Sequence, residues 1–158
     1  MDGRSQHHGD DSGESLLELL VAVTIMGIAL VAIVGGLVTA ILMSDIHRKQ
    51  ATAGSTLRYY AEAVEASVGA ASSAYIACAT TTTYASPTGF SAPSGYAAQV
   101  TGVRYWNDVG RTFSSTCPSP DGGVQKVSLR VGSSDGRASE TVDIVIRKPC
   151  RQSDSSCS

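Results

Sequence analysis

Apolar residues follow three different patterns along this chain, and each pattern predicts a different element. From Leu19 to Met43 no residue is charged, and fourteen of these 25 residues are Leu, Ile or Val. Such residues favour the bilayer by about 0.3–0.6 kcal/mol each, so the run gains roughly 6 kcal/mol before its polar members are counted. A helix of this length crosses the ~30 Å hydrocarbon core with some tilt. The first pattern therefore predicts one membrane-spanning helix.

Beyond Met43 the apolar residues recur at steps of three and four, as on one face of a helix. This stripe comprises Ile46, Ala53, Leu57, Tyr60, Ala61, Val64, Val68 and Ala71. No proline precedes Pro87, so one long helix from Glu14 to about Ala74 is predicted. Two helices with a break near residues 44–45 are the alternative. We interpret the stripe as core packing without catalytic meaning.

The last third of the chain alternates apolar and polar residues, as the strands of a half-buried sheet do. The predicted strands are residues 99–106, 124–131 and 140–148. Residues 121–123 and 132–136 carry turn residues, and the second group has the composition of a hairpin loop. The apolar side of an antiparallel sheet of three to four strands needs a cover, which the amphipathic half of the long helix supplies. The expected fold class is therefore α+β.

These patterns divide the chain into five segments. They are a polar N-terminal segment (1–13), the transmembrane helix (14–43), its amphipathic continuation (44–76), a loop region (77–98) and the antiparallel sheet with the C-terminal segment (99–158). A secretory signal peptide is the competing interpretation of the N-terminus. Its apolar region would be shorter, about 7–15 residues, and would end at a small-x-small cleavage site. A membrane anchor fits the longer run better.

Composition and charge narrow the functional classes. The formal net charge is −2 and no basic run exceeds Arg48-Lys49, so we do not expect nucleic-acid binding as a main function. Beyond residue 43 the chain has 115 residues (158 − 43). That length makes one small domain, whose modest core gains from covalent cross-links.

Four cysteines follow the apolar run, namely Cys78, Cys117, Cys150 and Cys157. They have no CxxC spacing, and all three histidines precede them, which favours disulfides over a metal site. Of the three possible pairings we favour Cys78–Cys117 with Cys150–Cys157, the second closing a short C-terminal loop. Oxidised cysteines imply an extracytoplasmic location for this part of the chain.

Catalytic motifs are absent from the sequence. It contains no G-x-S-x-G, Walker A, HExxH or GxGxxG pattern. The acidic residues of the predicted turns and strands, interpreted as a solvated face, are Asp108, Asp121, Asp135, Glu140 and Asp143. Asp135 and Asp154 could touch calcium, but neither lies in an EF-hand-like series of oxygens. Tyr105 and Trp106 are expected in the core or on the sheet surface rather than against DNA. We expect no enzyme, cofactor or metal.

One acidic residue, Glu18, stands at the edge of the apolar run. A carboxylate near the edge of the hydrocarbon costs about 2–3 kcal/mol unless it is paired. If the chain were cut after Gly13, the new amino group of Glu14 would lie four residues away on the same helix face. A cut at this point would create a positive charge that the existing Glu18 carboxylate can bind, within one subunit or between stacked ones.

Residues 13–23 read GESLLELLVAV and are followed by Gly27. This stretch resembles the class III signal of type IV pilins and pseudopilins, over about thirty residues of the chain. The resemblance implies that a prepilin peptidase cuts after Gly13 and methylates the new N-terminus at Glu14. It also implies that Glu18 pairs with the N-terminal amine of a neighbouring subunit during assembly.

The resemblance further implies a function. The chain would be a structural subunit, a minor pilin or pseudopilin, that waits in the inner or cytoplasmic membrane. It would then enter a helical filament with other pilin subunits, of a type IV pilus-like or type II secretion-like kind, and residues 77–98 would be the variable connection between helix and sheet.

The chain departs from the family pattern at three places. The first mature residue is commonly Phe or Met, and Glu14 in its place favours a minor subunit or pseudopilin. The leader is acidic, whereas family leaders are usually basic. Gly35-Gly36 stands where many pilins carry a helix-kinking proline. Because paired glycines also weaken a helix, local flexibility is expected there.

The signals for membrane orientation conflict. The positive-inside rule compares Arg4 before the run with Arg48, Lys49 and Arg58 after it, and so favours a cytoplasmic C-terminal part. The cysteines and the family layout both favour the outside. Because few charges are compared, we expect an extracytoplasmic C-terminal domain, carried on a cell-surface filament after assembly.

The alternative function is a membrane-anchored extracellular binding domain or enzyme that is not assembled into a filament. In that case the apolar helix is only an anchor, and no cut at Gly13 is expected.

Overall fold

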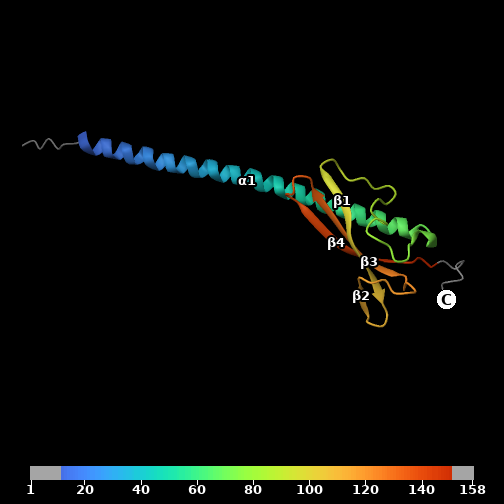
Figure 1. Cartoon of the computed structure of the whole chain (residues 1–158). Coiled ribbons are helices and arrows are strands. Elements are labelled where there is room, and N and C mark those ends of the chain that lie inside the picture. The colour runs from blue at the N-terminus through green and yellow to red at the C-terminus, as the bar shows by residue number, and fades with distance from the viewer. Residues whose placement is uncertain (1–11, 151–158) are drawn as a thin grey trace, which may run out of the picture. The chain divides into compact units, whose positions relative to one another are not determined.

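The computed structural model describes residues 12–150 of the 158-residue chain. Its elements are the helix α1 (Ser12–Gly69), the 3-10 helix η1 (Ser72–Ala74) and the strands β1 (Tyr96–Asn107), β2 (Thr112–Ser114), β3 (Val124–Ser133) and β4 (Ser139–Arg147) (Figure 1). The strands form one antiparallel sheet in the order β2-β1-β3-β4. The α+β fold class is confirmed. The chain divides into two units, Met1–Ser44 and Asp45–Ser158.

In the first unit the described residues all belong to α1. Every side chain from residue 15 to residue 44 is exposed, and the large apolar ones are 46–75% exposed. The Thr24 and Thr39 hydroxyls donate to the carbonyl oxygens of Leu20 (2.7 Å) and Gly35 (3.0 Å). These polar side chains are thus satisfied within the helix itself. By length and composition, α1 is capable of crossing a membrane.

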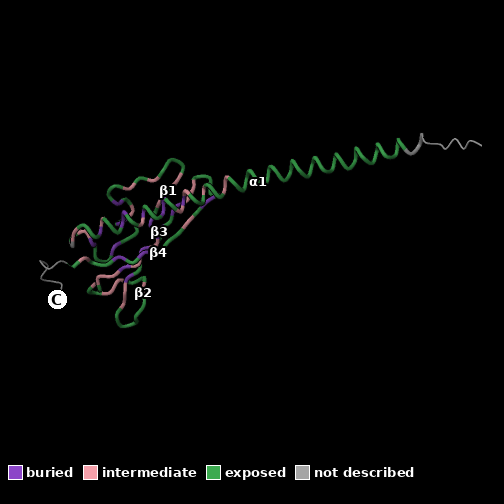
Figure 2. Tube along the Cα trace, turned by 180° about the vertical axis from the view of Figure 1, so that it is seen from behind, coloured by how far each residue is buried: buried purple, intermediate pink, exposed green. Residues whose placement is uncertain are grey.

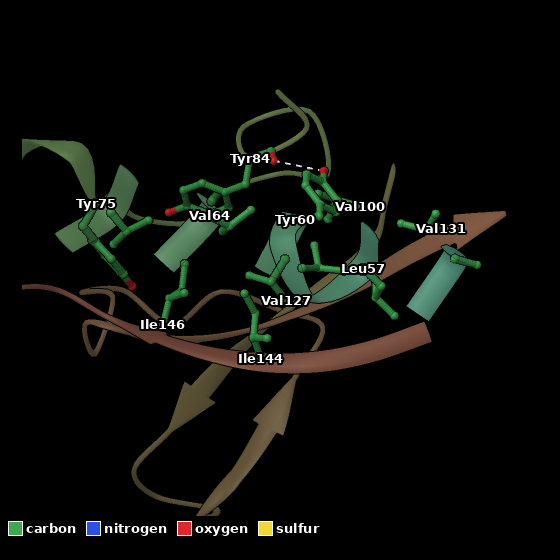
Figure 3. Close-up of a cluster of buried hydrophobic side chains, with 14 of the residues drawn as sticks. Leu57, Tyr60, Val64, Tyr75, Tyr84, Val100, Val127, Val131, Ile144 and Ile146 are labelled. Atoms are coloured by element: carbon green, nitrogen blue, oxygen red, sulfur yellow. Dashed lines mark hydrogen bonds between the residues drawn. The ribbon is translucent and has the colours of Figure 1, made fainter. Parts of the chain in front are cut away.

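In the second unit α1 buries one face against the sheet (Figures 2 and 3). The predicted stripe supplies the buried face, with exposures of 6% or less at Ala53, Leu57, Tyr60, Val64 and Val68. Its partners on the sheet include Val100 of β1, Val127, Leu129 and Val131 of β3, and Ile144 and Ile146 of β4. The core therefore lies between the amphipathic half of α1 and one face of the sheet, as the helical and strand periods predicted.

A bulge explains why β1 alternates imperfectly. The pairing of β1 with β3 shifts between Val100 and Gly102. One extra residue, Thr101, reverses the faces of the strand. Val100 is buried before the shift and Tyr105 after it, so even-numbered residues face the core first and odd-numbered residues afterwards.

Several boundaries differ from the prediction. The helix ends at Gly69 and not near Ala74, because glycine is a poor helix former and a separate 3-10 turn follows. Helical structure is continuous across residues 44–45, so the alternative of two helices is wrong. β1 begins at Tyr96, before the predicted start at residue 99. β2 was not predicted, since a three-residue strand is too short to show alternation.

Candidate functional site

The predicted assembly site lies in the first turns of α1. The backbone of Gly13 and Glu14 is helical, and the side chain of Glu14 is not described. Glu18 follows one turn later and is exposed. Within residues 12–150, no ion pair involves Glu18. Glu14 and Glu18 are four residues apart in a regular helix, so both lie on one face of it.

The surroundings of Glu18 are apolar. Leu16, Leu17, Leu19 and Leu20 flank it and are 73%, 67%, 64% and 66% exposed. Glu18 is also the single charged residue between residues 15 and 44. A lone carboxylate on such a surface is stable in water or at a membrane interface, but in hydrocarbon it requires a cation. Within residues 12–150 the structure thus presents Glu18 as an acidic side chain without an ion pair, on an exposed apolar surface.

The glycine pair lies inside continuous helix. A Cβ added at Gly35 or Gly36 would meet nothing within 4 Å, so close packing inside the chain does not require glycine there. The helix is regular at this point. The flexibility expected of Gly35 and Gly36 during assembly stays a prediction.

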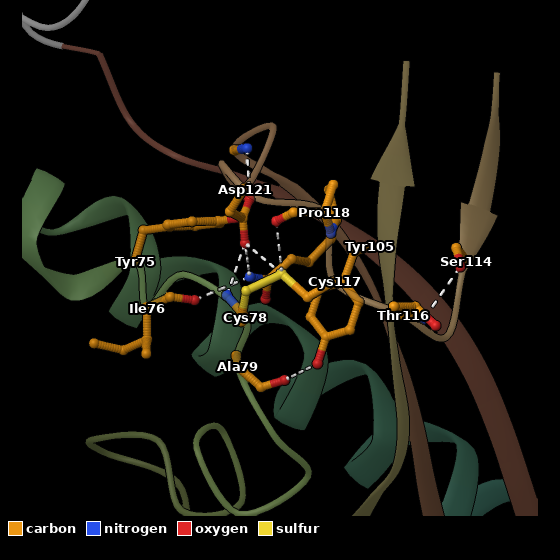
Figure 4. The surroundings of a disulfide bond; sticks show 12 residues. Tyr75, Ile76, Cys78, Ala79, Tyr105, Ser114, Thr116, Cys117, Pro118 and Asp121 are labelled. Atoms are coloured by element: carbon orange, nitrogen blue, oxygen red, sulfur yellow. Dashed lines mark hydrogen bonds between the residues drawn. A yellow bond between two sulfur atoms is a disulfide. The ribbon is translucent and has the colours of Figure 1, made fainter. Parts of the chain in front are cut away.

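A second polar centre lies in the Asp45–Ser158 unit, around the disulfide Cys78–Cys117 (Figure 4). This bond confirms one half of the favoured pairing. Cys150 is also disulfide-bonded, and Cys157, its predicted partner, lies outside the described residues. The Cys78–Cys117 bond joins the segment after α1 to the segment before β3.

Beside this disulfide, the Asp121 carboxylate accepts four hydrogen bonds. The Tyr75 hydroxyl and the Gly123 amide donate to Oδ1 at 2.8 and 2.6 Å. The Cys78 amide and the Gln125 side chain donate to Oδ2 at 2.7 and 3.1 Å. Asp121 therefore links the same two segments as the disulfide does.

The electrostatics of this centre follow from burial and hydrogen bonding. Burial by itself would raise the pKa of the Asp121 carboxyl, but the amides of Cys78 and Gly123, then Tyr75 and Gln125, together hold that pKa below its usual value. Burial raises the pKa of Tyr75 far above its usual value, and the Asp121 carboxylate adds to the effect. At neutral pH Asp121 is thus ionised and Tyr75 is a hydrogen-bond donor.

The sequence interpretation missed the role of Asp121, which was assigned to a solvated turn. The available signal was the Asp-Gly-Gly order, because an aspartate commonly accepts a hydrogen bond from the amide two residues later. Its contacts with Tyr75 and Cys78 span 46 and 43 residues. No local pattern predicts such contacts.

The donor atoms of Cys78, Cys117 and Asp121 lie within 4.8 Å of one another. A metal site would need the thiolates, and the disulfide consumes them. The cluster is therefore structural, in agreement with the preference for disulfides over metal.

Asp135, considered above for calcium, is instead held by a cation. It forms an ion pair with Lys49, which also pairs with Asp45 at 3.0 Å. The Lys49 side chain, followed by Ser133 and the Arg137 amide, holds the pKa of Asp135 well below its usual value. The hydrogen bond to Asp135, followed by that to Asp45, raises the pKa of Lys49. The other calcium candidate, Asp154, lies outside the described residues.

The two neighbouring aromatic residues of β1 lie on opposite faces of the sheet. Tyr105 is buried, and its hydroxyl donates to the Ala79 carbonyl at 2.6 Å. The Trp106 ring contacts Phe113 of β2 edge-on, with 5.2 Å between ring centroids. One residue therefore serves the core and the other the outer surface.

Comparison of the chain with protein-family models, with curated proteins and with solved structures finds no match in any of the three. The resemblance to pilins accordingly stays a prediction carried by residues 13–27.

Proposed function

We propose that this chain is a structural subunit, a minor pilin or pseudopilin, of a type IV pilus-like or type II secretion-like filament. In this proposal it is cut after Gly13 and assembled through the apolar half of α1. The observation that supports the proposal most is Glu18, the one charge between residues 15 and 44 and exposed among exposed leucines. The chain itself supplies no cover for this surface in the described residues.

The proposed mechanism links proteolysis to assembly. The cut frees an amine at Glu14 near the membrane interface. As α1 leaves lipid and packs among apolar helices of other subunits, water withdraws from Glu18, and an unpaired carboxylate becomes costly. An amine on a neighbouring subunit then binds Glu18, so the ion pair favours one axial offset between helices. Hydrophobic contacts hold the filament core, and the ion pair sets its register.

The Asp45–Ser158 unit supports an exported location. It contains the disulfide Cys78–Cys117, and disulfides persist in oxidising compartments. In the proposed subunit this domain lies outside the cytoplasm, before assembly and on the filament.

Mass spectrometry of the mature N-terminus tests the first step. In a host with an active prepilin peptidase, the chain is expected to begin at a methylated Glu14. A matched Gly13→Val variant should keep Met1, because a branched side chain replaces the residue at the cut. A wild-type chain that also begins at Met1 would contradict the proposal and favour the membrane-tethered domain.

Substitution of Glu18 tests the second step. Glu18→Ala and Glu18→Gln should leave the protein in the membrane but lower its incorporation into filaments, whereas Glu18→Asp should retain more of it. Leu17→Ala is the matched control on the neighbouring exposed position. Incorporation is measured as subunit in sheared filaments relative to subunit in membranes. Equal ratios for wild type and Glu18→Gln would contradict the proposed ion pair.

A further inference from the structure

β4 leaves one row of backbone groups unpaired. It pairs with β3 on one side, and no other strand of residues 12–150 pairs with its second side. The Lys148 amide donates to the Gly123 carbonyl at 2.8 Å. The backbone N–H and C=O groups of successive residues point to opposite sides of a strand, so those of the even-numbered residues of β4 point toward β3. The odd-numbered residues therefore present their N–H and C=O groups at the free edge.

The side chains of these edge residues are self-complementary. Asp143, Val145 and Arg147 are exposed on the outer face of the sheet, and Val145 is 47% exposed. Asp143 lies two residues before Val145, and Arg147 lies two residues after it. In an antiparallel pair with Val145 opposite Val145 of another copy, Asp143 lies opposite Arg147 twice. Opposite charges in this position stabilise paired strands.

We propose that the free edge of β4 binds β4 of a second copy of this chain, antiparallel and with the two Val145 residues facing each other. The inner face supports the same register, because it places Ile144 opposite Ile146 of the second copy. If the second copy slides by two residues in either direction, Val145 comes to lie opposite Asp143 or opposite Arg147, and the two charges no longer face each other. The register centred on Val145 is the one that pairs both charges directly.

Apolar surface flanks this edge on both faces of the sheet. On the outer face, a groove of about 480 Å³ is lined by Trp106, Asp108, Phe113, Gly122, Val124, Val145 and Arg147. Between α1 and β4 a second groove of about 300 Å³ is lined by Glu65, Val68, Gly69, Val145, Ile146, Arg147 and Pro149. Val145 lines both grooves, and a strand added beside β4 would withdraw part of this exposed side chain from water.

The charges of β4 do not act as the usual protection of an edge strand. Natural edges are commonly blocked by like charges, above all lysine, which repel a second copy. In β4, Asp143 and Arg147 carry opposite charges on either side of Val145, so this register brings Arg147 of the second copy to Asp143. In each copy the Asp143 carboxylate also pairs with Lys126 at 3.0 Å and accepts a hydrogen bond from Ser128 at 2.6 Å, both on β3. The resulting pair is isologous and closes at two copies. It is independent of the proposed filament contact, which repeats along one direction through α1.

Cysteine cross-linking tests the register. Val145→Cys is introduced into the full chain, purified in nonionic detergent and oxidised mildly. Facing residues of a hydrogen-bonded antiparallel pair have Cα atoms about 5.5 Å apart, within the roughly 4.4–6.8 Å range of disulfides. Thr141→Cys is the control on the same strand, edge and face. In the proposed register the two Thr141 residues lie about 27 Å apart, at ~3.4 Å per residue.

A disulfide-linked dimer is expected for Val145→Cys and not for Thr141→Cys, and the same detergent controls for association through α1. Absence of a Val145→Cys dimer, or equal cross-linking of both variants, would overturn the proposal. So would cross-linking that appears only after residues 151–158 are removed, with Cys150→Ser to avoid a new free thiol. That result would assign the edge to the terminus of the same chain.

Exchanging the charges at Asp143 and Arg147 gives an independent test of the register. In the Val145→Cys background, Asp143→Arg or Arg147→Asp alone should lower the dimer fraction, because each places like charges opposite one another. The two changes together restore opposite charges and should restore the dimer. Circular dichroism checks that each variant is folded. If the double variant stays as monomeric as the single ones, the proposed pairing is wrong.

Discussion

The two halves of α1 contain many apolar residues and use them differently. Residues 15–44 are exposed on every side, whereas residues 45–69 bury one stripe against the sheet. Spacing is the difference. Apolar residues at three- and four-residue steps leave a polar face for water, so the chain can cover the other face itself. A helix that is apolar all round has no face for water, and in residues 12–150 the chain supplies no cover for it.

The largest expected effect comes from the buried stripe. Tyr60 is fully buried, and its hydroxyl donates to the carbonyls of Tyr84 and Ala85. Tyr60→Ala should lower the free energy of unfolding of the Asp45–Ser158 unit by about 3–5 kcal/mol. Denaturant unfolding in detergent, followed by fluorescence of Trp106, measures it. Val31→Ala, at a position 75% exposed, should change it by less than about 0.5 kcal/mol. Equal losses would break the contrast between the two halves.

A charge in the uniformly apolar half should act on the membrane and not on the fold. Val31→Lys places an ammonium near the middle of the apolar run, at a cost of about 2.5–3.5 kcal/mol for insertion. More protein should then be extracted from membranes by carbonate, with unfolding of the Asp45–Ser158 unit unchanged. Glu65→Lys, on the exposed side of the second half, is the matched control and should stay in the membrane.

Asp121 bears on the comparison between the two halves of α1, because it holds the segment that follows the buried half. Asp121→Asn removes a charged acceptor of four hydrogen bonds and should cost about 1–3 kcal/mol. The folded pKa of Asp121 is depressed, so its contribution is present above the ordinary value of 3.8 and lost as pH falls through the folded pKa.

Thermal unfolding by circular dichroism between neutral and acidic pH measures this effect. The Asn variant should lose less stability than wild type in that acidic range. Asp108→Asn, which removes an exposed carboxylate bonded to Trp106, should keep the wild-type acid dependence. An unchanged acid dependence in Asp121→Asn would show that the carboxylate does not hold the segment.

The smallest effect is expected where the second half of α1 begins. Lys49→Met removes exposed ion pairs to Asp45 and Asp135, and exposed pairs contribute little. The change should be smaller than that of Asp121→Asn and should vanish near 1 M salt, where the screening length is about 3 Å. Lys49→Arg should behave as wild type. A large, salt-independent loss would mean that packing, and not charge, holds the hairpin between β3 and β4 against α1.

Prediction from the sequence succeeded where one physical signal dominates over several turns. The α+β class, the buried stripe of α1, three of the four strands and the Cys78–Cys117 bond were all expected and are present. It failed where the deciding contact is distant or the element is short. Asp121 binds partners more than 40 residues away, and β2 pairs with β1 through only three residues.

By itself, the sequence determined one helix long and apolar enough to cross a membrane, because no charge interrupts residues 19–43 and no polar face is available to water. It also determined that Glu18 is the one acid on that surface. Only the tertiary structure decided that Asp121 is saturated with hydrogen bonds and that β4 is an edge. Those properties depend on which strands pair and which loops meet. Such contacts join residues tens of positions apart, and local periodicity does not specify them.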